Sequence, residues 1–191
     1  MNPITIRPAT PADRAAVLAL RARSLRGLGR GHLSLAAIEA VVAVDDIDDR
    51  LLGGGTYLVA LMGNRVVGAG GWSLDAPGFG RAIGGVVIHG DPLPTVRGLY
   101  VDPVCAGHGL GRRLLARVEG SIVDAGWRRA VLTASPMGLG FYERQGWRRL
   151  ADVTLDVAGH AIPSHEMDKI VLPGALSHAT NPGVRAGARA A

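Results

Sequence analysis

The strongest chemical signal in this chain is a run of alternating glycines after a short apolar segment. The run Gly107-His108-Gly109-Leu110-Gly111 follows Leu99-Tyr100-Val101 and leads into an amphipathic stretch. Glycine lets the backbone approach a ligand closely, and a helix start presents unpaired N–H groups with a partial positive charge. The pattern predicts an anion-binding turn, and a phosphate is the anion that suits it best.

The helix predicted after this turn carries two cations at its start. Its apolar residues recur every four positions, which is typical of a helix packed on a sheet: Leu110, Leu114, Val118 and Ile122. Arg112 and Arg113 stand at the positive end of the helix dipole, which costs about 0.3–1 kcal/mol each unless an anion lies nearby. A solvated basic face explains the two arginines equally well. The neighbouring glycines favour the phosphate.

Two common phosphate-binding motifs are excluded by the spacing. The chain has no Gly-x-x-x-x-Gly-Lys-Ser/Thr run, which disfavours a nucleoside triphosphatase of the Walker type. The run Gly107–Gly111 also lacks the final spacing of the dinucleotide fingerprint. The sequence therefore indicates a different phosphate-bearing ligand.

The segment around the glycines resembles the central motif of the GNAT superfamily of N-acetyltransferases. That motif reads Val-x-Pro, then Arg/Gln-x-x-Gly-x-Gly/Ala, and here it is Val101-Asp102-Pro103 followed by Ala106-Gly107-His108-Gly109-Leu110-Gly111. Ala106 departs from the motif, which has Arg or Gln there. The resemblance implies that backbone amides of the turn hold the pyrophosphate of acetyl-CoA, while the preceding strand holds its pantetheine arm and polarises the thioester. The implied cofactor-binding residues are Leu99, Tyr100, Val101, Gly107, His108, Gly109, Leu110, Gly111, Arg112 and Arg113.

A second segment strengthens the resemblance. A strand is predicted over Ala130–Ser135 and a helix over Pro136–Gln145, and the run Phe141–Trp147 matches the family's Phe-Tyr-Glu-x-x-Gly-aromatic pattern. In the family this tyrosine lies near the cofactor sulfur and returns a proton to the leaving thiolate. The resemblance implies that Tyr142 is the catalytic acid. From the residue alone, an ordinary half-buried core tyrosine is the alternative.

The remaining elements are predicted from alternation and capping signals. Thr10-Pro11-Ala12-Asp13 is a helix-start pattern with an N-cap, a proline at the first helical position and an acid at the third. The other predicted elements are a strand over Ile4–Pro8, a helix ending at about Leu25, a helix capped by Ser34, and strands over Thr56–Met62, Arg65–Trp72, Arg148–Val157 and Ile162–Val171. The resemblance implies an α/β (α+β mixed) fold, with a twisted, mixed, mostly antiparallel sheet of about seven strands flanked by about four helices.

The acceptor side is less defined by the sequence. His89 and Asp91, in the long Gly- and Pro-rich segment 74–94, are candidate acceptor contacts, although a surface loop without chemistry is the favoured alternative. His165 and Glu166 face either the cleft or solvent. The family often has an acidic general base on its fourth strand, but Thr95–Val101 contains no acid, so the base stays unassigned.

Length and composition set further limits. The 191 residues, 48% of them hydrophobic, predict one domain over 1–173, followed by a disordered tail over 174–191 that is rich in Gly, Ala and Arg. We find neither a secretory signal pattern nor an apolar run long enough to cross a membrane. The single Cys105 suits a reducing compartment, where it is expected to be a packing residue. We therefore expect a cytoplasmic protein without a membrane partner.

The net charge of +5 raises the question of nucleic acid. The arginines are scattered and aromatic residues make up only 4% of the chain, so a nucleic-acid partner is disfavoured, although basic nucleic-acid binding stays a rival. The acidic run Asp45–Asp49 lacks the glycine and distal glutamate of a calcium loop and reads as a helix start. We expect no metal.

These patterns favour an acetyl-CoA-dependent N-acetyltransferase. The acetyl group would pass to a primary amine by direct attack in a ternary complex, and the acceptor would be a small molecule or a peptide. A catalytically silent acyl-CoA-binding or sensing domain is the alternative, since Ala106 replaces a motif side chain. The acceptor's identity and the presence of a homodimer stay open.

Overall fold

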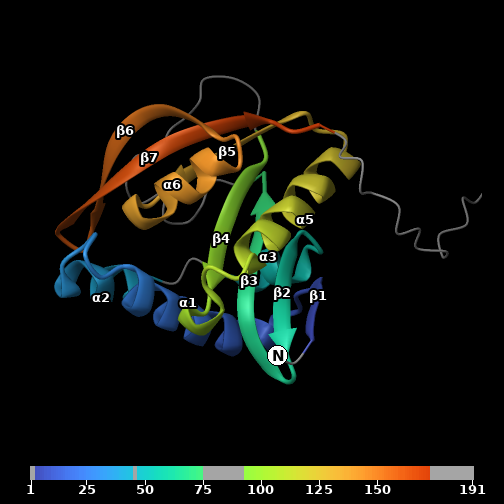
Figure 1. The fold of residues 1–191 in the computed structure, drawn as a ribbon, viewed down its shortest axis with the longest axis horizontal. Coiled ribbons are helices and arrows are strands. Elements are labelled where there is room, and N and C mark those ends of the chain that lie inside the picture. Colours follow the sequence, from blue (N-terminus) through green and yellow to red (C-terminus); the bar gives the residue numbers. More distant parts are fainter. Residues whose placement is uncertain (1–2, 45–46, 75–92, 173–191) are drawn as a thin grey trace, which may run out of the picture.

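One seven-stranded sheet forms the centre of the protein (Figure 1). The computed structural model describes residues 3–44, 47–74 and 93–172. In chain order the strands are β1 (Ile4–Pro8), β2 (Tyr57–Met62), β3 (Arg65–Ser73), β4 (Thr95–Val101), β5 (Arg129–Ala134), β6 (Arg148–Val157) and β7 (His160–Ile170). Their spatial order is β1-β2-β3-β4-β5-β7-β6, and every neighbouring pair is antiparallel except β4 and β5. The expected mixed, mostly antiparallel sheet is confirmed.

Five α-helices accompany the sheet within the described residues. They are α1 (Arg14–Leu28), α2 (Leu35–Ala43), α3 (Asp49–Gly53), α5 (Leu110–Asp124) and α6 (Pro136–Arg144), with short 3-10 helices η1 (Pro11–Asp13) and η2 (Pro103–Cys105). About four were expected, and the single-turn helix α3 begins within the acidic run that was interpreted as a helix start. Asp48 caps α3 by accepting a hydrogen bond from the Leu51 N–H at 2.7 Å. This part of the acidic run therefore starts a helix, as predicted, while residues 45 and 46 lie outside the described residues.

Helices cover both faces of the sheet. On one face, α1 and α3 bury Val17 and Leu52 against the β2 residues Tyr57 and Val59. On the other face, α5 buries the apolar stripe predicted from its sequence: Leu110, Leu114, Val118 and Ile122. The sheet therefore separates an α1 face from an α5 face. A site that uses residues from both faces needs an opening in the sheet.

The β6–β7 hairpin extends beyond the rest of the sheet and reaches α2 (Figure 1). Leu155 of β6 and Ile162 of β7 form a small apolar cluster with Ala37 of α2. Alternation along β7 places Ser164 and Glu166 on the same side as Ile162. This side of β7 therefore belongs to the α1 face of the sheet.

Some predicted features lie outside the described residues. His89 and Asp91 fall in the segment 75–92, and the predicted tail falls in 173–191. The domain boundary at residue 173 therefore stays a prediction. Within the described ranges, none of the helices is long and apolar enough to span a bilayer. A search of the same ranges finds no cluster of three His, Cys, Asp or Glu residues suited to a metal ion.

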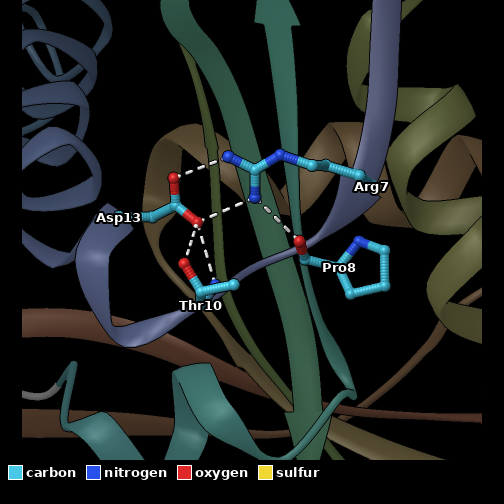
Figure 2. A network of polar contacts seen from close by, with 4 residues as sticks. All are labelled: Arg7, Pro8, Thr10 and Asp13. Carbon is cyan, nitrogen blue, oxygen red and sulfur yellow. Dashed lines mark hydrogen bonds and ion pairs between the residues drawn. The ribbon is translucent and has the colours of Figure 1, made fainter.

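A polar network fastens β1 to the start of α1 (Figure 2). The Asp13 carboxylate accepts two hydrogen bonds from the Arg7 guanidinium, both at 2.8 Å. It also accepts from the backbone N–H of Thr10 at 2.8 Å and from the Thr10 hydroxyl at 3.0 Å. The bonds from Arg7, and with them those from Thr10, outweigh the effect of burial and lower the pKa of Asp13 to about 2. The predicted helix-start residues thus act together with an arginine that the sequence did not single out.

We predict that Asp13→Asn lowers the free energy of unfolding at pH 7 by about 1–2 kcal/mol, discounted for the half-exposed arginine partner. Because the folded-state pKa is depressed, the Asp13 carboxylate stabilises the protein above pH of about 4 and loses this effect as the pH falls toward 2. Urea unfolding of wild type and variant at pH 7 and pH 3 should show the difference shrinking at the lower pH.

The exposed Asp124 at the end of α5 provides the control. Asp124→Asn should change the free energy of unfolding by less than about 0.5 kcal/mol. A difference between wild type and Asp13→Asn that stays constant between pH 7 and pH 3 would contradict the role of the ion pair.

Candidate functional site

The sheet opens between β4 and β5. These two parallel strands share a single aligned pair, Thr95 with Val131, whereas β5 and β7 align over six pairs. Beyond Thr95 and Val131 the two strands separate. A cavity of about 1070 Å³ lies here, and the residues that line it include members of β4 to β7 and of α1, α2, α5 and α6. The cavity therefore connects the α1 face with the α5 face through the middle of the sheet.

A bulge in β4 lies at the mouth of this opening. Ala69 aligns with Tyr100 and Gly71 with Arg97, so two steps along β3 correspond to three along β4. Gly98 has φ of +57°, which other residues rarely adopt. The extra residue of a bulge is left out of the regular hydrogen-bond ladder. A backbone polar group near Gly98 and Leu99 is therefore not used in the hydrogen-bond ladder of the sheet and lies beside the cavity.

Tyr57 fixes the conformation of the bulge. Its hydroxyl donates a hydrogen bond to the Gly98 carbonyl at 2.8 Å. A Cβ atom at position 98 would lie 2.6 Å from the same hydroxyl oxygen, so a side chain cannot be added there without moving Tyr57. Because the peptide is trans, the Leu99 N–H points away from the carbonyl that Tyr57 holds. This bulge was not predicted from the sequence, although a glycine within an apolar strand is a signal for one.

The glycine turn between η2 and α5 has the backbone geometry that its sequence suggested. Gly107 and Gly109 have φ of +77° and +81°, and a Cβ built on either meets no atom within 4 Å. Gly109 is the N-cap of α5, which begins at Leu110. The space beside the turn is open, and the unpaired N–H groups of the first helical turn begin there. These residues fit an anion such as a phosphate.

Asp102 anchors the chain just before this turn. Its carboxylate is 1% exposed and accepts hydrogen bonds from Arg23 of α1 at 2.9 Å and from Arg65 of β3 at 2.8 Å. It also accepts from the Val104 N–H at 3.3 Å, which starts η2. Burial opposes its charge, but the hydrogen bonds from Arg23, Val104 and Arg65 outweigh it and lower the pKa of Asp102. The turn is therefore fixed to two distant elements, which the sequence did not reveal.

Most of the residues predicted to hold the cofactor line the cavity. Those that do are Leu99, Tyr100, Val101, Gly107, Gly109, Gly111 and Arg112. His108, Leu110 and Arg113 are not among the lining residues. The exposed His108 has its Nδ1 2.8 Å from the Ala106 carbonyl, and Leu110 is buried in the core. Arg113 is exposed on the surface of α5.

Tyr142 lines the same cavity from α6. Its ring makes edge contacts with Phe141 and Trp147, at centroid distances of 5.1 and 6.0 Å. Burial, and to a lesser extent Tyr100, raises the pKa of Tyr142. Its hydroxyl therefore stays protonated and able to donate at neutral pH. The structure brings this tyrosine and the glycine turn to one cavity. The neighbouring Phe141 ring contacts the start of α5, since it lies 3.4 Å from the position that a Cβ atom on Gly111 would have.

The two acceptor-side candidates on β7 diverge. Glu166 is 9% exposed and lines the cavity. His165 is not among the lining residues, and its Nδ1 lies 2.8 Å from a carboxylate oxygen of Asp152 on β6. Alternation along a strand predicts that the side chains of His165 and Glu166 point to opposite faces of the sheet, but it does not predict which of them faces the cavity. Cys105 is buried beside the turn, as expected for a packing residue.

Comparison with known proteins identifies the family to which this open sheet and its glycine turn belong. Residues 34–170 match the acetyltransferase (GNAT) domain. The chain therefore belongs to the GNAT acetyltransferase family. A relative described as an uncharacterized N-acetyltransferase, ycf52-like, from the organism Prochlorococcus marinus, is 38% identical over 86 residues. The match covers 44% of this chain and 47% of that protein, so the chain spans about half the length of this relative.

Solved structures show the same fold. A GCN5-related N-acetyltransferase from Rhodopseudomonas palustris has a TM-score of 0.71 and 22% identity, over 89% of this chain and 96% of that one. The PaiA N-acetyltransferase from Thermoplasma acidophilum, solved with coenzyme A, has a TM-score of 0.65 and 17% identity, over 88% and 99%. YncA from Salmonella typhimurium, solved with acetyl-CoA, has a TM-score of 0.60 and 20% identity, over 94% and 100%.

Gly109→Ala tests the anion-binding turn, with Gly159→Ala as a matched control. Gly109 and Gly159 have φ of +81° and +80°, and both have open space around a Cβ, so alanine should cost similar backbone strain of about 1–2 kcal/mol. Only the first methyl group would occupy space meant for a phosphate. We predict that Gly109→Ala weakens coenzyme A binding at least tenfold in calorimetry, while Gly159→Ala changes it less than twofold. Equal affinities of the two variants would contradict an anion site at the turn.

Proposed function

We propose that the protein is an acetyl-CoA-dependent N-acetyltransferase that transfers an acetyl group to a primary amine by direct attack in a ternary complex. One observation carries this proposal: a single cavity joins the glycine turn, Tyr142 and the α1 face through the opening between β4 and β5. Two substrates that approach from opposite faces can meet there. Direct transfer then needs no covalent intermediate on the protein.

The turn and the first residues of α5 are proposed to hold the pyrophosphate. Backbone N–H groups from Gly107 to Gly111 supply donors, and Arg112 supplies a positive charge at the cavity. His108 and Leu110 would contribute through their backbone, and Arg113 through its charge. Ala106 offers no side-chain donor, so in this chain the pyrophosphate depends on the backbone and the arginines.

The bulge of β4 is proposed to act on the thioester. Leu99, Tyr100 and Val101 line the cavity along the exposed edge of β4, where their backbone can pair with the pantetheine amides. The backbone N–H freed near Gly98 would donate to the thioester carbonyl oxygen. A donor fixed in advance, here by Tyr57, stabilises the charge that develops on this oxygen without costly reorganisation.

Tyr142 is proposed as the general acid. Its pKa is raised, so the hydroxyl carries its proton at neutral pH and can donate it to the sulfur as the thiolate leaves. Its ring is held by Phe141 and Trp147, which limits the positions of the hydroxyl.

Binding and turnover test the proposal separately. Acetyl-CoA at about 100 times its dissociation constant should stabilise the fold by about 2.7 kcal/mol, measured as a thermal shift. A screen of primary amines with detection of released thiol should then identify an acceptor. A thermal shift near zero at millimolar acetyl-CoA would overturn the proposal. Binding without thiol release for every amine would instead show a silent acyl-CoA-binding domain.

Tyr142→Phe should lower kcat at least tenfold and leave the dissociation constant of acetyl-CoA nearly unchanged. The variant keeps the ring and its packing but removes the proton donor, and general acid catalysis contributes about 10²- to 10⁴-fold. We set the lower bound at tenfold because a thiolate is a good leaving group and water can replace the hydroxyl in part. Steady-state kinetics with calorimetry of cofactor binding measure both quantities. A variant with the wild-type kcat across the pH range would show that Tyr142 is a packing residue.

A further inference from the structure

Glu166 is a buried carboxylate with an unsatisfied oxygen. Its side chain belongs to β7 and lines the cavity, yet the residue is only 9% exposed. Its Oε1 atom has no hydrogen-bond partner among the described residues. Burying an unsatisfied carboxylate oxygen is costly, and burial accordingly raises the pKa of Glu166. The free oxygen can accept a hydrogen bond or a proton from a ligand that enters the cavity.

Two charged side chains of this region, Asp168 and Arg21, make other interactions. Asp168, two residues along β7, accepts hydrogen bonds from Arg129 and Arg148. Arg21 of α1 also lines the cavity, but its guanidinium donates to the carbonyls of Val41 and Val44 near the end of α2. Among the cavity-lining residues that the structure describes, Glu166 is the single acid.

The sheet register places Glu166 level with the reacting end of the cavity. Glu166 aligns with Thr133 of β5, two residues beyond Val131, where β5 last pairs with β4. On the parallel strand β4, the bulge at Gly98 lies three residues beyond Thr95. At about 3.3 Å per residue, Gly98 and Thr133 lie at nearly the same height on either side of the opening. Glu166 therefore lies across the opening from the backbone donors of β4.

The wall beside Glu166 is apolar. Ile162 lies on the same side of β7 as Glu166, and it packs with residues of α2 and β6. The apolar members of this cluster that also line the cavity are Leu33, Val41, Leu155 and Ile162. Ser164 lies between Ile162 and Glu166 on that side. A ligand that reaches Glu166 along β6 and β7 would meet this aliphatic surface, while Arg21, Ser24 and His32 line the cavity from the side of α1.

We infer that Glu166 is the acceptor-amine site: its carboxylate binds the ammonium group of the acceptor and takes one of its protons, and the acceptor is a primary amine on an apolar body. This inference rests on the proposed acetyltransferase function and deepens it. It supplies the proton acceptor that β4, which contains no acid, does not provide.

The proton and electron balance is complete with the groups on hand. The ammonium gives one proton to Glu166, which passes it to solvent. The freed nitrogen lone pair forms the new C–N bond, and the electron pair of the C–S bond leaves with the sulfur. Tyr142 protonates the sulfur and then regains a proton from the nitrogen. Of the three ammonium protons, the first reaches solvent through Glu166. The second replaces the proton that Tyr142 gave to the sulfur, and the third stays on the amide nitrogen.

Glu166→Gln is the direct test, because glutamine keeps the size of the side chain but cannot accept the proton. We expect kcat/KM for an amine acceptor to fall at least 100-fold, with acetyl-CoA affinity within twofold of wild type. Glu39→Gln, which removes an exposed carboxylate paired with Arg26 on the surface, should leave both quantities unchanged. A Glu166→Gln variant with wild-type kcat/KM would overturn the inference.

Stability separates a chemical role from a structural one. Replacing a buried carboxylate that lacks a cation by a neutral amide should leave the melting temperature at pH 7.5 equal to or above that of wild type. A variant that loses both activity and several degrees of melting temperature would show that Glu166 serves the fold, which would also overturn the inference.

A panel of amines tests the acceptor class with wild-type protein. The probes are 2-phenylethylamine and hexylamine, which are apolar, and spermidine and glycinamide, which are polar. We expect the apolar pair to have kcat/KM values at least tenfold higher. Preference for a polar amine would overturn the inference while leaving the acetyltransferase function intact. Failure to bind acetyl-CoA would instead refute the proposed function, so the two failures are distinguishable.

Discussion

The functional site depends on the hydrogen bonds that β4 and β5 do not make. In a regular parallel pair the ladder would continue along both strands, but here it stops after the alignment of Thr95 with Val131. The strands beyond this point leave backbone donors and a cavity in the middle of the sheet, where the hydrophobic core would otherwise close. The surrounding structure must stabilise this opening, since beyond Thr95 the strand β4 stays aligned with β3 but no longer with β5.

Buried polar contacts provide that support at the middle of β4 and just after its end. Near its middle, the Tyr57 hydroxyl holds the Gly98 carbonyl and with it the bulge. Just after its end, Asp102 joins α1, β3 and the start of η2 through three hydrogen bonds. Hydrogen bonds to charged groups are stronger than neutral ones, and they are directional. The α1 helix is thereby tied to the glycine turn on the opposite side of the sheet, so the two walls of the cavity keep their spacing.

The sequence predicts features that depend on neighbours along the chain. The α5 stripe, the glycine turn and the strands of the β2–β3 and β6–β7 hairpins follow from local periodicity and backbone preference, and the structure agrees with them within a few residues. Features that depend on distant pairing were missed or left open. The partners Tyr57 and Gly98, or Arg23 and Asp102, are separated by 41 and 79 positions. Nothing in local spacing links such residues, and burial of Glu166 likewise depends on which face of β7 meets α2.

The site contains two carboxylates, Asp102 and Glu166, that are buried in different ways. Asp102 is buried with two arginines, so its charge is stabilised and its pKa lies low. Glu166 is buried without an arginine partner among the residues that the structure describes, and burial raises its pKa. A fully paired carboxylate fixes geometry but is a poor proton acceptor, whereas an unpaired one destabilises the fold and retains affinity for a cation or a proton. Asp102 therefore holds the chain before the glycine turn in place, whereas Glu166, across the opening between β4 and β5, is the carboxylate that we propose takes a proton.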